Sequence, residues 1–443
     1  MTATRMTSNQ DTLALQTRRK ITRRIIPFLF ALYVFSFLDR VNVGFAGLDM
    51  TRELGFSNTV FGFGSGIFFV GYCLLEIPGG LLSETWSTRK WIAAIMIVWG
   101  VLAGFTGLIR NATEFNIIRF LLGTAEGGFF PAVLVYLTHW FRARDRAKAI
   151  AMFMTGVPVA SVLGAPVSGM LMRVHWLGLG GWRWLLILEG LPAALGGLAC
   201  LWYLTDRPAD AKWLLPEERA WITGEIAREK GHLHASHGNI RAALREPLVI
   251  AFAISYFCTN LSLYGLGIWL PKIVQKLSGL GTLRLGFLIA VPYLISVPAM
   301  LFSGWRSDHT GHHRRWAAGA AFTTAVGVAL SQVVGDNATL SVAAFAVATV
   351  GIMSYYPPLL ALPSRILTGR GVAASFGLIN LIANLGGFAG PYLIGFLTDR
   401  TKKYSAGLYV LVASSLLSGL ILVLLRDGRV SGRAKSGERM PGG

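Results

Sequence analysis

The sequence is poor in charge and in cysteine. Only 14% of its 443 residues are Asp, Glu, Lys or Arg, compared with about 25% in soluble globular domains, and this excludes an ordinary soluble protein. Its three cysteines, Cys73, Cys200 and Cys258, all lie in apolar runs without a C-x-x-C pair or a metal-ligand spacing. They therefore provide neither a disulfide framework nor a metal site.

Motifs for catalysis and for the use of ATP are also missing. The sequence contains no G-x-x-x-x-G-K-S/T loop, so any work that the protein does on a ligand would have to be driven by a gradient and not by ATP. The polar loops hold no His/Asp/Ser or metal-binding constellation, which argues against a membrane enzyme. We expect no enzymatic activity, no cofactor and no metal.

Long apolar segments make up most of the chain, of which 53% is hydrophobic. The segments long enough to cross a bilayer lie near residues 25–49, 57–79, 90–109, 113–139, 147–172, 183–204, 248–271, 282–304, 316–334, 338–362, 373–396 and 405–425. The sequence therefore predicts an all-α membrane protein with twelve transmembrane helices.

The basic residues orient these helices. Lys and Arg outnumber Asp and Glu by 41 to 22, and such an excess could indicate a nucleic-acid partner. Most of them, however, fall in alternate loops and in the two terminal tails. This is the positive-inside pattern, with both termini in the cytoplasm. Topology thus explains the basic excess, and we expect membrane lipid and no nucleic acid as a partner.

The longest polar stretch divides the segments six and six. It opens with a Pro-rich turn after Asp206 and continues with mixed charge, which predicts an amphipathic helical linker. The expected organisation is a cytoplasmic tail (1–24), a six-helix bundle (25–204), a cytoplasmic linker (205–247), a second six-helix bundle (248–425) and a basic tail (426–443).

A motif that occurs in both halves indicates an internal duplication. Gly80 and Glu84 follow the second segment, and Gly304 and Asp308 follow the eighth at the same spacing. A loop acid of this kind can bind helix ends and arginines, and so hold two helices together as part of a gate. The alternative is that both acids are ordinary solvated loop charges.

Two acid–arginine sets lie inside apolar segments of the first half. Asp39 and Arg40 are adjacent in the first segment, whereas Arg119 and Glu126 are seven residues apart in the fourth and so lie nearly on one helix face. A charge at this depth costs at least about 2.5 kcal/mol, so it needs a partner or a water-filled cavity. Two arginines can clamp a carboxylate, and buried acids can carry protons.

We therefore interpret Arg40 and Arg119 as substrate-binding groups and Asp39 and Glu126 as proton-coupling groups. An anion that takes over the arginine charge should push the neighbouring acid toward protonation. The alternative is a permanent structural ion pair between Arg119 and one acid.

The second half differs from the first because its segments hold essentially no charge away from their ends. It offers amides and aromatic rings instead, among them Asn380. A polar acid held by charge on one half and by amides on the other would bind near the midplane of the membrane. Glu189, in the sixth segment, we interpret as a structural partner of a loop or helix end.

Several stretches resemble a known family. Six plus six segments with the repeated loop motif are similar to the major facilitator superfamily, and within it to the anion:cation symporters, carriers of galactonate-, tartrate- and phthalate-type acids. The stretches are LDRVNVGFA (38–46), GYCLLEIPGGLL (71–82), RFLLGTAEGGFFP (119–131), GWRWLLILEGLPA (181–193) and NLIANLGGFAGPYLIG (380–395).

The resemblance implies the major facilitator fold and the roles given above for the two acids and the two arginines. It also implies that Tyr72 and Asn380 contact the substrate. Where relatives often have a tyrosine and a tryptophan, this chain has Phe37 and Leu360. The loss of two polar groups favours a less hydroxylated or aromatic acid over a sugar acid.

The sequence thus predicts a secondary transporter that imports a small organic (carboxylate) anion in symport with protons by alternating access. An exporter or anion exchanger on the same fold, or a non-transporting sensor, is the alternative. We expect a monomer that crosses a bacterial inner membrane several times.

Overall fold

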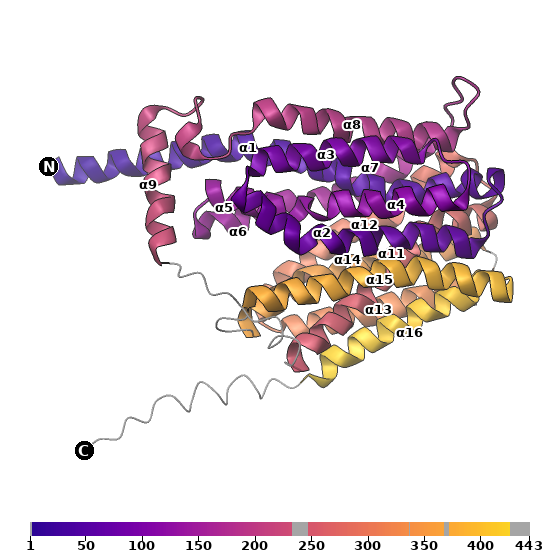
Figure 1. The fold of residues 1–443 in the computed structure, drawn as a ribbon. Helices are drawn as coiled ribbons and strands as arrows, with labels where there is room; N and C mark the ends of the chain where they lie inside the picture. Colours follow the sequence, from indigo (N-terminus) through magenta and orange to yellow (C-terminus); the bar gives the residue numbers. More distant parts are fainter. Residues whose placement is uncertain (1, 233–246, 336, 367–371, 426–443) are drawn as a thin grey trace, which may run out of the picture. The chain divides into compact units, whose positions relative to one another are not determined.

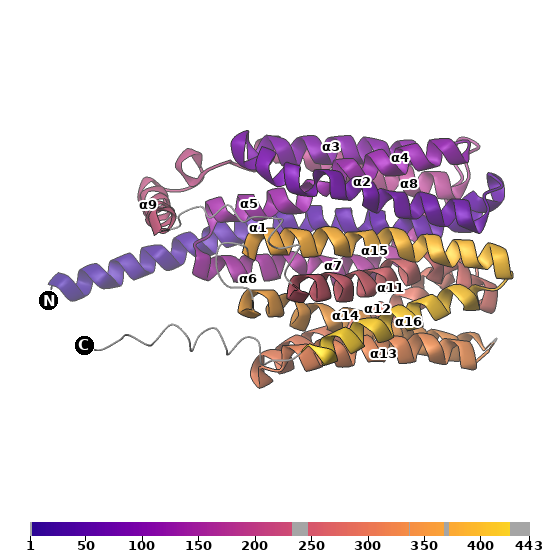
Figure 2. The ribbon, with the colours of Figure 1, turned by 60° about the horizontal axis from the view of Figure 1, so that its bottom comes forward.

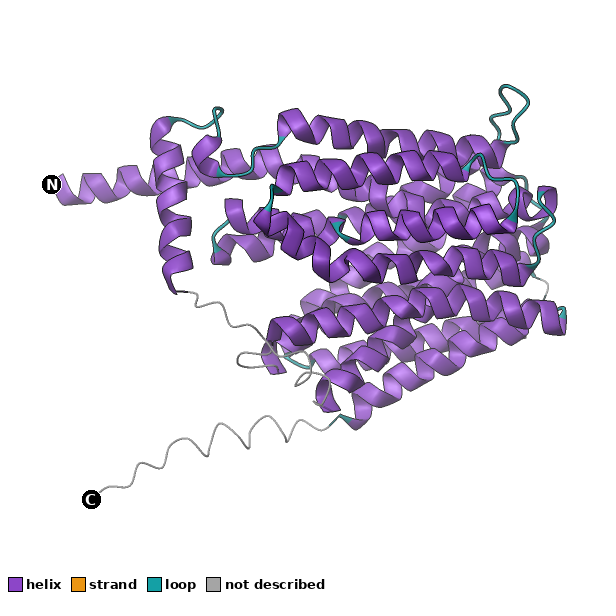
Figure 3. Cartoon of the chain, in the orientation of Figure 1, coloured by secondary structure: helices purple, strands orange, loops and turns teal. Residues whose placement is uncertain are grey.

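The computed structural model of the chain describes residues 2–232, 247–335, 337–366 and 372–425. Within these ranges all regular structure is helical (Figure 3). Contacts divide the chain into two compact units, Met1–Ala235 with Gly267–Ala290, and Ser236–Leu266 with Val291–Gly443. The ends of two helices of the second half are therefore packed within the first unit.

The helices of the first unit are α1 (Thr2–Glu53), α2 (Asn58–Thr85), α3 (Thr88–Thr106), α4 (Ala112–Gly127), α5 (Phe129–Trp140), α6 (Ala143–Met154), α7 (Gly156–Leu171), α8 (Gly181–Tyr203) and α9 (Pro216–His232). Those of the second are α13 (His313–Val333), α14 (Ala338–Ile366), α15 (Val372–Thr401) and α16 (Tyr404–Leu424). Both units share α11 (Pro247–Ser278) and α12 (Thr282–Thr310).

Twelve of the described helical stretches are long and apolar enough to cross a membrane. One consists of α4 and α5 together (Ala112–Trp140), and another of α6 and α7 (Ala143–Leu171). Polar caps fix several helix starts: Ser57 accepts a hydrogen bond from the backbone of Val60, and Asn111 accepts one from Glu114. These helices confirm the predicted all-α membrane fold.

The first helix is longer than its apolar segment. α1 begins at Thr2, so most of the predicted tail continues it as helix, and in Figures 1 and 2 its N-terminal end extends past its neighbours in the first unit. Two basic residues of this extension form ion pairs with other helices of the unit, Arg18 with Asp145 and Lys20 with Glu218. Arg18 and Lys20, which contributed to the positive-inside pattern, therefore also bind other helices of the first unit.

α9, which falls in the predicted linker, crosses the end of the first unit beside this extension (Figures 1 and 2). Three of its glutamates bind basic residues of α1 and the start of α6. The pairs are Glu218–Lys20 (2.8 Å), Glu225–Arg142 (2.9 Å) and Glu229–Arg146 (2.9 Å). We call these six residues the α9 clasp. Burial opposes the charge of Arg142, but its hydrogen bonds to Glu225 and Asp145 raise its pKa above the usual value.

The second unit is held together by neutral polar contacts. Ser255 on α11 hydrogen-bonds to Tyr355 on α14 at 2.7 Å and to Ser418 on α16 at 2.9 Å. The Asn260 amide donates to the carbonyl of Ala383 at 3.0 Å. Among the described residues of this unit no Asp, Glu, Lys or Arg is buried. The buried Asp, Glu and Arg residues of the described chain therefore lie in the first unit.

Candidate anion and proton site

Helical spacing gives α1 two functional sides. Ser36 and Arg40 are four residues apart and Asp39 and Asn42 are three apart, so each pair lies on one side of the helix. Ser36 and Arg40 contact Glu126 on α4. Asp39, with Asn42 beside it, contacts α3 instead. α1 is therefore the element that joins the charged groups of several helices.

Close packing of α2 on α4 places two aromatic rings next to these charges. A side chain on Gly123 would collide with the carbonyl oxygen of Phe68, and one on Gly127 with that of Tyr72. Only glycine allows two backbones to approach this closely. The guanidinium of Arg40 consequently lies 4.9 Å from the centre of the Tyr72 ring.

Glu126 is fully buried and is bound through one of its two oxygens. Its Oε1 accepts hydrogen bonds from Ser36 Oγ at 2.6 Å and from Arg40 Nε at 2.8 Å, and Arg40 Nη2 lies 2.7 Å away. Its Oε2 has no hydrogen-bond partner among the described residues. Charge-assisted bonds stabilise the ionised form, while the second oxygen is available for a proton.

Asp39 is also buried, but its contacts are neutral. Oδ1 accepts a hydrogen bond from the Asn42 amide at 3.0 Å, and Oδ2 accepts one from the Trp99 indole at 2.9 Å. Within the described part of the chain Asp39 forms no ion pair. The two acids thus differ: a cation and a hydroxyl hold Glu126, and two uncharged donors hold Asp39.

Arg119 is a buried cation without an acceptor. Its side chain is only 2% exposed, its Nε has no partner, and no ion pair or hydrogen bond joins it to any described residue. Its guanidinium lies over the Phe68 ring at 4.8 Å, and Asp39 and Glu126 act on it only at longer range. Taking a guanidinium out of water without an acceptor is costly, so this position is suited to an anionic ligand.

The structure thus brings together five of the predicted site residues in the first unit: Asp39, Arg40, Tyr72, Arg119 and Glu126. The buried ion pair joins Arg40 to Glu126 across two helices. The alternative in which Arg119 is permanently bound to one of the acids does not match this arrangement. Arg40 is paired with the Glu126 carboxylate, whereas Arg119 has no such partner among the described residues.

The remaining predicted residues lie away from this cluster. Asn380 belongs to the second unit, half-buried on α15. Glu84 is exposed at the end of α2 and makes no ion pair with a described residue. The side chain of Asp308 is 71% exposed, and its nearest ionisable neighbour within 4 Å is His313, whose Nδ1 is 3.7 Å from its Oδ1.

The two glycines of the repeated motif have equivalent surroundings. A side chain on Gly80 would contact Pro131, and one on Gly304 would contact Pro357, each a proline of the helix two spans further along. Such matching positions are what an internal duplication predicts. In the described part of the chain no group of three or more His, Cys, Asp or Glu residues could hold a metal ion.

Sequence reasoning overlooked Ser36, Asn42 and Trp99, and it did not connect Glu189 with Asp39. The first two could have been found, because they lie one helical turn from Arg40 and Asp39. Trp99 and Glu189 come from other helices, and no spacing connects them to Asp39. Glu189 accepts a hydrogen bond from Ser168 in the last turn of α7, but α8 also carries it about two turns into the bundle, where it is buried beside Asn42.

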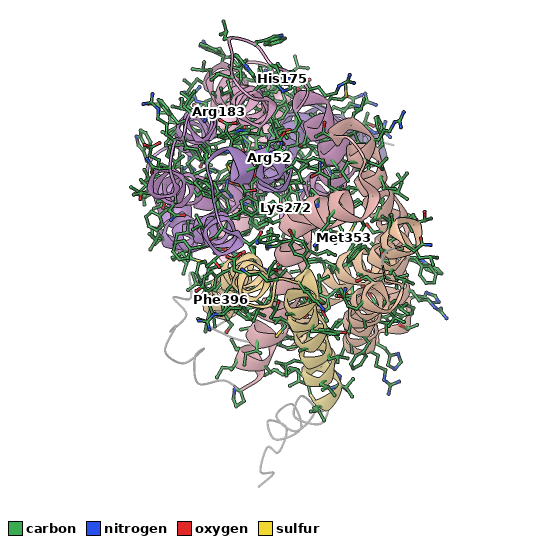
Figure 4. All side chains as sticks on the ribbon, turned by 90° about the vertical axis from the view of Figure 1, so that its right-hand side faces the viewer. Arg52, His175, Arg183, Lys272, Met353 and Phe396 are labelled. Carbon is green, nitrogen blue, oxygen red and sulfur yellow. The ribbon has the colours of Figure 1, made fainter. Side chains whose placement is uncertain are left out.

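At the end of the first unit opposite α9, the end of α11 packs on α1 and α2. Lys272 Nζ donates to Thr51 Oγ1 at 2.9 Å and lies 4.7 Å from the centre of the Phe61 ring. α8 is bound there as well, through Arg183 to Glu53 at 2.9 Å. Figure 4 views this end and labels Arg183 and Lys272.

Twelve spanning helices with a buried charged cluster and an unpaired internal cation are features of a membrane transport protein. The sequence model of the Major Facilitator Superfamily matches residues 29–391. The chain belongs to this superfamily, and it is a transporter, not an enzyme.

Similar proteins agree with this assignment. The chain is 45% identical over 410 residues to the "Putative tartrate transporter" of Agrobacterium vitis, covering 92% of this chain and 90% of that protein. It is 35% identical over 415 residues to the "Quinolone resistance transporter" of Acinetobacter baumannii, covering 92% and 94%. The predicted likeness to organic-anion carriers is thereby confirmed.

The fold has a solved counterpart. The xylose transporter XylE from E. coli, in a partially occluded inward open conformation, superposes with a TM-score of 0.73 at 14% sequence identity. The match covers 93% of this chain and 99% of that one. At this identity the likeness concerns the fold alone.

Proposed function

We propose that the chain is a secondary active transporter that imports a small organic acid in symport with protons by alternating access. The observation that carries this proposal is Arg119, a buried guanidinium with no acceptor among the described residues. A carboxylate is the natural ligand of such a group, because a guanidinium fork matches its two oxygens. The Phe68 ring on one face of the guanidinium limits its orientation.

Coupling to protons follows from the competition for Arg40. Glu126 shares this arginine, so an anion that enters between Arg119 and Arg40 weakens the attraction that keeps Glu126 ionised. Glu126 then takes up a proton on its free oxygen, and Asp39, which has no cation of its own, is a second proton acceptor. Two protons balance the charge of a dicarboxylate.

The proposed substrate class is a short carboxylic acid with few hydroxyl groups, such as tartrate. Two observations support it: the name of the Agrobacterium relative, and Phe37, whose hydrocarbon ring lies 5.7 Å from the Arg40 guanidinium. A hydrocarbon ring cannot hydrogen-bond a further hydroxyl group. A polyhydroxylated sugar acid would therefore be bound less well.

We further propose that the transporter is a monomer in the bacterial inner membrane, with both termini and the α9 clasp in the cytoplasm. The basic residues of α1 and of the α5–α6 loop support this orientation. The end at which Lys272 contacts Thr51 would then face the outside.

A thermal-shift experiment on detergent-purified protein tests the anion site. Tartrate and a series of other organic acids should raise the unfolding temperature of the natural protein. Arg119→Gln should lose at least about 30-fold in affinity, because removing one partner of a desolvated charge pair costs about 2 kcal/mol or more. The matched control is Arg110→Gln, since Arg110 is exposed before α4. Equal stabilisation of both variants would contradict the site.

Transport in proteoliposomes tests coupling and direction. An inside-alkaline pH gradient should drive uptake of the acid that stabilises the protein, and Glu126→Gln and Asp39→Asn should abolish the effect of the gradient. The name of the Acinetobacter relative favours a second function, export of an organic compound. Net efflux driven by the same inside-alkaline gradient, with no uptake, would support export in exchange for protons and contradict import.

A further inference from the structure

Glu189 is a buried acid that the proposed mechanism does not use. Its residue is 8% exposed, in the middle of an apolar helix. Ser168 on α7 donates a hydrogen bond to its Oε1 at 3.2 Å, and Asn42 on α1 donates to the same carboxyl group. Its Oε2 is buried and has no hydrogen-bond partner in the described part of the chain.

Asn42 connects this acid to the proposed proton site. Its amide nitrogen donates to Asp39 Oδ1 at 3.0 Å as well as to Glu189, so one side chain bridges two carboxyl groups. The three-residue spacing of Asp39 and Asn42 on α1 sets this bridge. The Asn42 Oδ1 atom has no partner among the described residues, so the cluster keeps a free acceptor for a proton-bearing group.

No cation of the described helices around Glu189 compensates its charge. α8 packs against α1, α3 and α7. The charged group of these helices that acts on Glu189 is Asp39, which is itself negative. Arg40 is bound to Glu126, α7 carries no charged residue, and the charges of α3 and α8 lie near their ends. These end charges are Arg89, Lys90 and Arg183.

Two ionised carboxylates in this position would repel each other with only neutral donors to stabilise them. Desolvation and like charge both disfavour the doubly ionised state of two neighbouring carboxyl groups. The Arg40–Glu126 pair differs, because a guanidinium contacts that carboxylate directly. Glu126 is stabilised by the Arg40 guanidinium. Asp39 and Glu189 have no such cation, so they need a shared proton instead.

We propose that Asp39 and Glu189, bridged by Asn42, form a proton-sharing carboxyl pair. Glu189 is then a further proton-binding residue of the transporter. The inference rests on the proposed function for its role in transport, but the pair itself does not depend on a substrate. One proton stays on the pair while the anion site is empty. Glu189 can then supply or accept the proton that Asp39 exchanges during transport.

Infrared spectroscopy of the purified protein without substrate tests the pair directly. At neutral pH the natural protein should show the C=O stretching band of a protonated carboxyl group, and this band should shift on H–D exchange. Glu189→Gln should remove or displace the band, and Asn42→Leu should shift it because the bridging amide is lost. The control is Glu217→Gln, which removes an exposed carboxylate in the first turn of α9.

The outcomes separate this inference from the proposed function. A band that is identical in the natural protein, Glu189→Gln and Asn42→Leu at every pH would overturn the pair, even if proton-driven uptake persists. A band that responds as expected in a protein without proton-driven uptake would support the pair and contradict the transport proposal. If Glu189→Gln does not fold, Asn42→Leu alone decides, because an unchanged band in that variant excludes the bridge.

Discussion

Phe68 is the residue that the two arginines of the site share. Its ring lies 4.8 Å from the Arg119 guanidinium and 5.8 Å from that of Arg40, and the side chain is buried. An aromatic face attracts a cation without neutralising it, so it can hold a guanidinium in place and leave its N–H groups for a ligand. A carboxylate in the same position would instead neutralise the arginine charge that attracts the anionic ligand.

Replacing this ring should weaken anion binding without removing a charge. We expect Phe68→Leu to reduce the affinity for the stabilising acid by about 2- to 30-fold, the equivalent of the 0.5–2 kcal/mol of a buried cation–π contact. Isothermal titration of the purified variant measures this change. Phe129→Leu is the control, because Phe129 is buried in the same unit and its ring packs on Tyr33 and Trp99. Equal losses in both variants would indicate a general packing defect.

At the scale of the helix, glycine decides how close α2 and α4 come. A Cβ at Gly123 would meet the Phe68 carbonyl, whereas a Cβ at Gly104 of α3 would meet no atom within 4 Å. Gly123→Ala should therefore destabilise the protein by about 1–3 kcal/mol, as overpacking does. Gly104→Ala should be neutral or stabilising by up to about 1 kcal/mol, because alanine favours helix. Thermal unfolding of the two variants compares these values, and a Gly123→Ala protein as stable as Gly104→Ala would contradict the close packing.

The α9 clasp makes a separate prediction about charge. Arg146→Glu places two acids side by side, so α9 should detach and become sensitive to protease. Combining it with Glu229→Arg should restore most of the protection, with a coupling of about 0.2–1 kcal/mol that falls at high salt. Arg144→Glu is the control, because Arg144 is exposed in the first turn of α6 and lies outside the clasp. Failure of the double variant to recover would show that the ion pair does not hold α9.

Part of the fold and of the candidate site could be predicted from the sequence, and part could not. Apolar length and the cost of buried charge identified the spans and four of the charged residues, because both are properties of a single segment. The pairing of Arg40 with Glu126 depends on how α1 and α4 are rotated against each other. The seven-residue spacing of Arg119 and Glu126 describes one helix only, so it could not show that Arg119 is unpaired.

At the scale of the whole molecule, the ends of α11 and α12 belong by sequence to the second half but pack in the first unit. A side chain on Gly44 of α1 would collide with the backbone of Ile268, and one on Gly286 of α12 with that of Ala165. The alternating access that we propose requires these contacts to separate and form again in each cycle. Small residues at the contacts allow the backbones to meet, so a larger residue should favour the separated state.

We therefore expect Gly286→Val to hold α12 away from α7 and to open this end of the first unit. The reporter is a cysteine at Phe61, which is fully buried against Trp269, in a chain whose three natural cysteines are replaced. A membrane-impermeant thiol reagent added from outside should label it at least several-fold faster with Gly286→Val than without. Gly281→Val is the matched control, because a side chain there meets no atom within 4 Å. Since the valine resists closure in every cycle, uptake should fall as labelling rises, and equal labelling of the two variants would mean that these contacts do not separate.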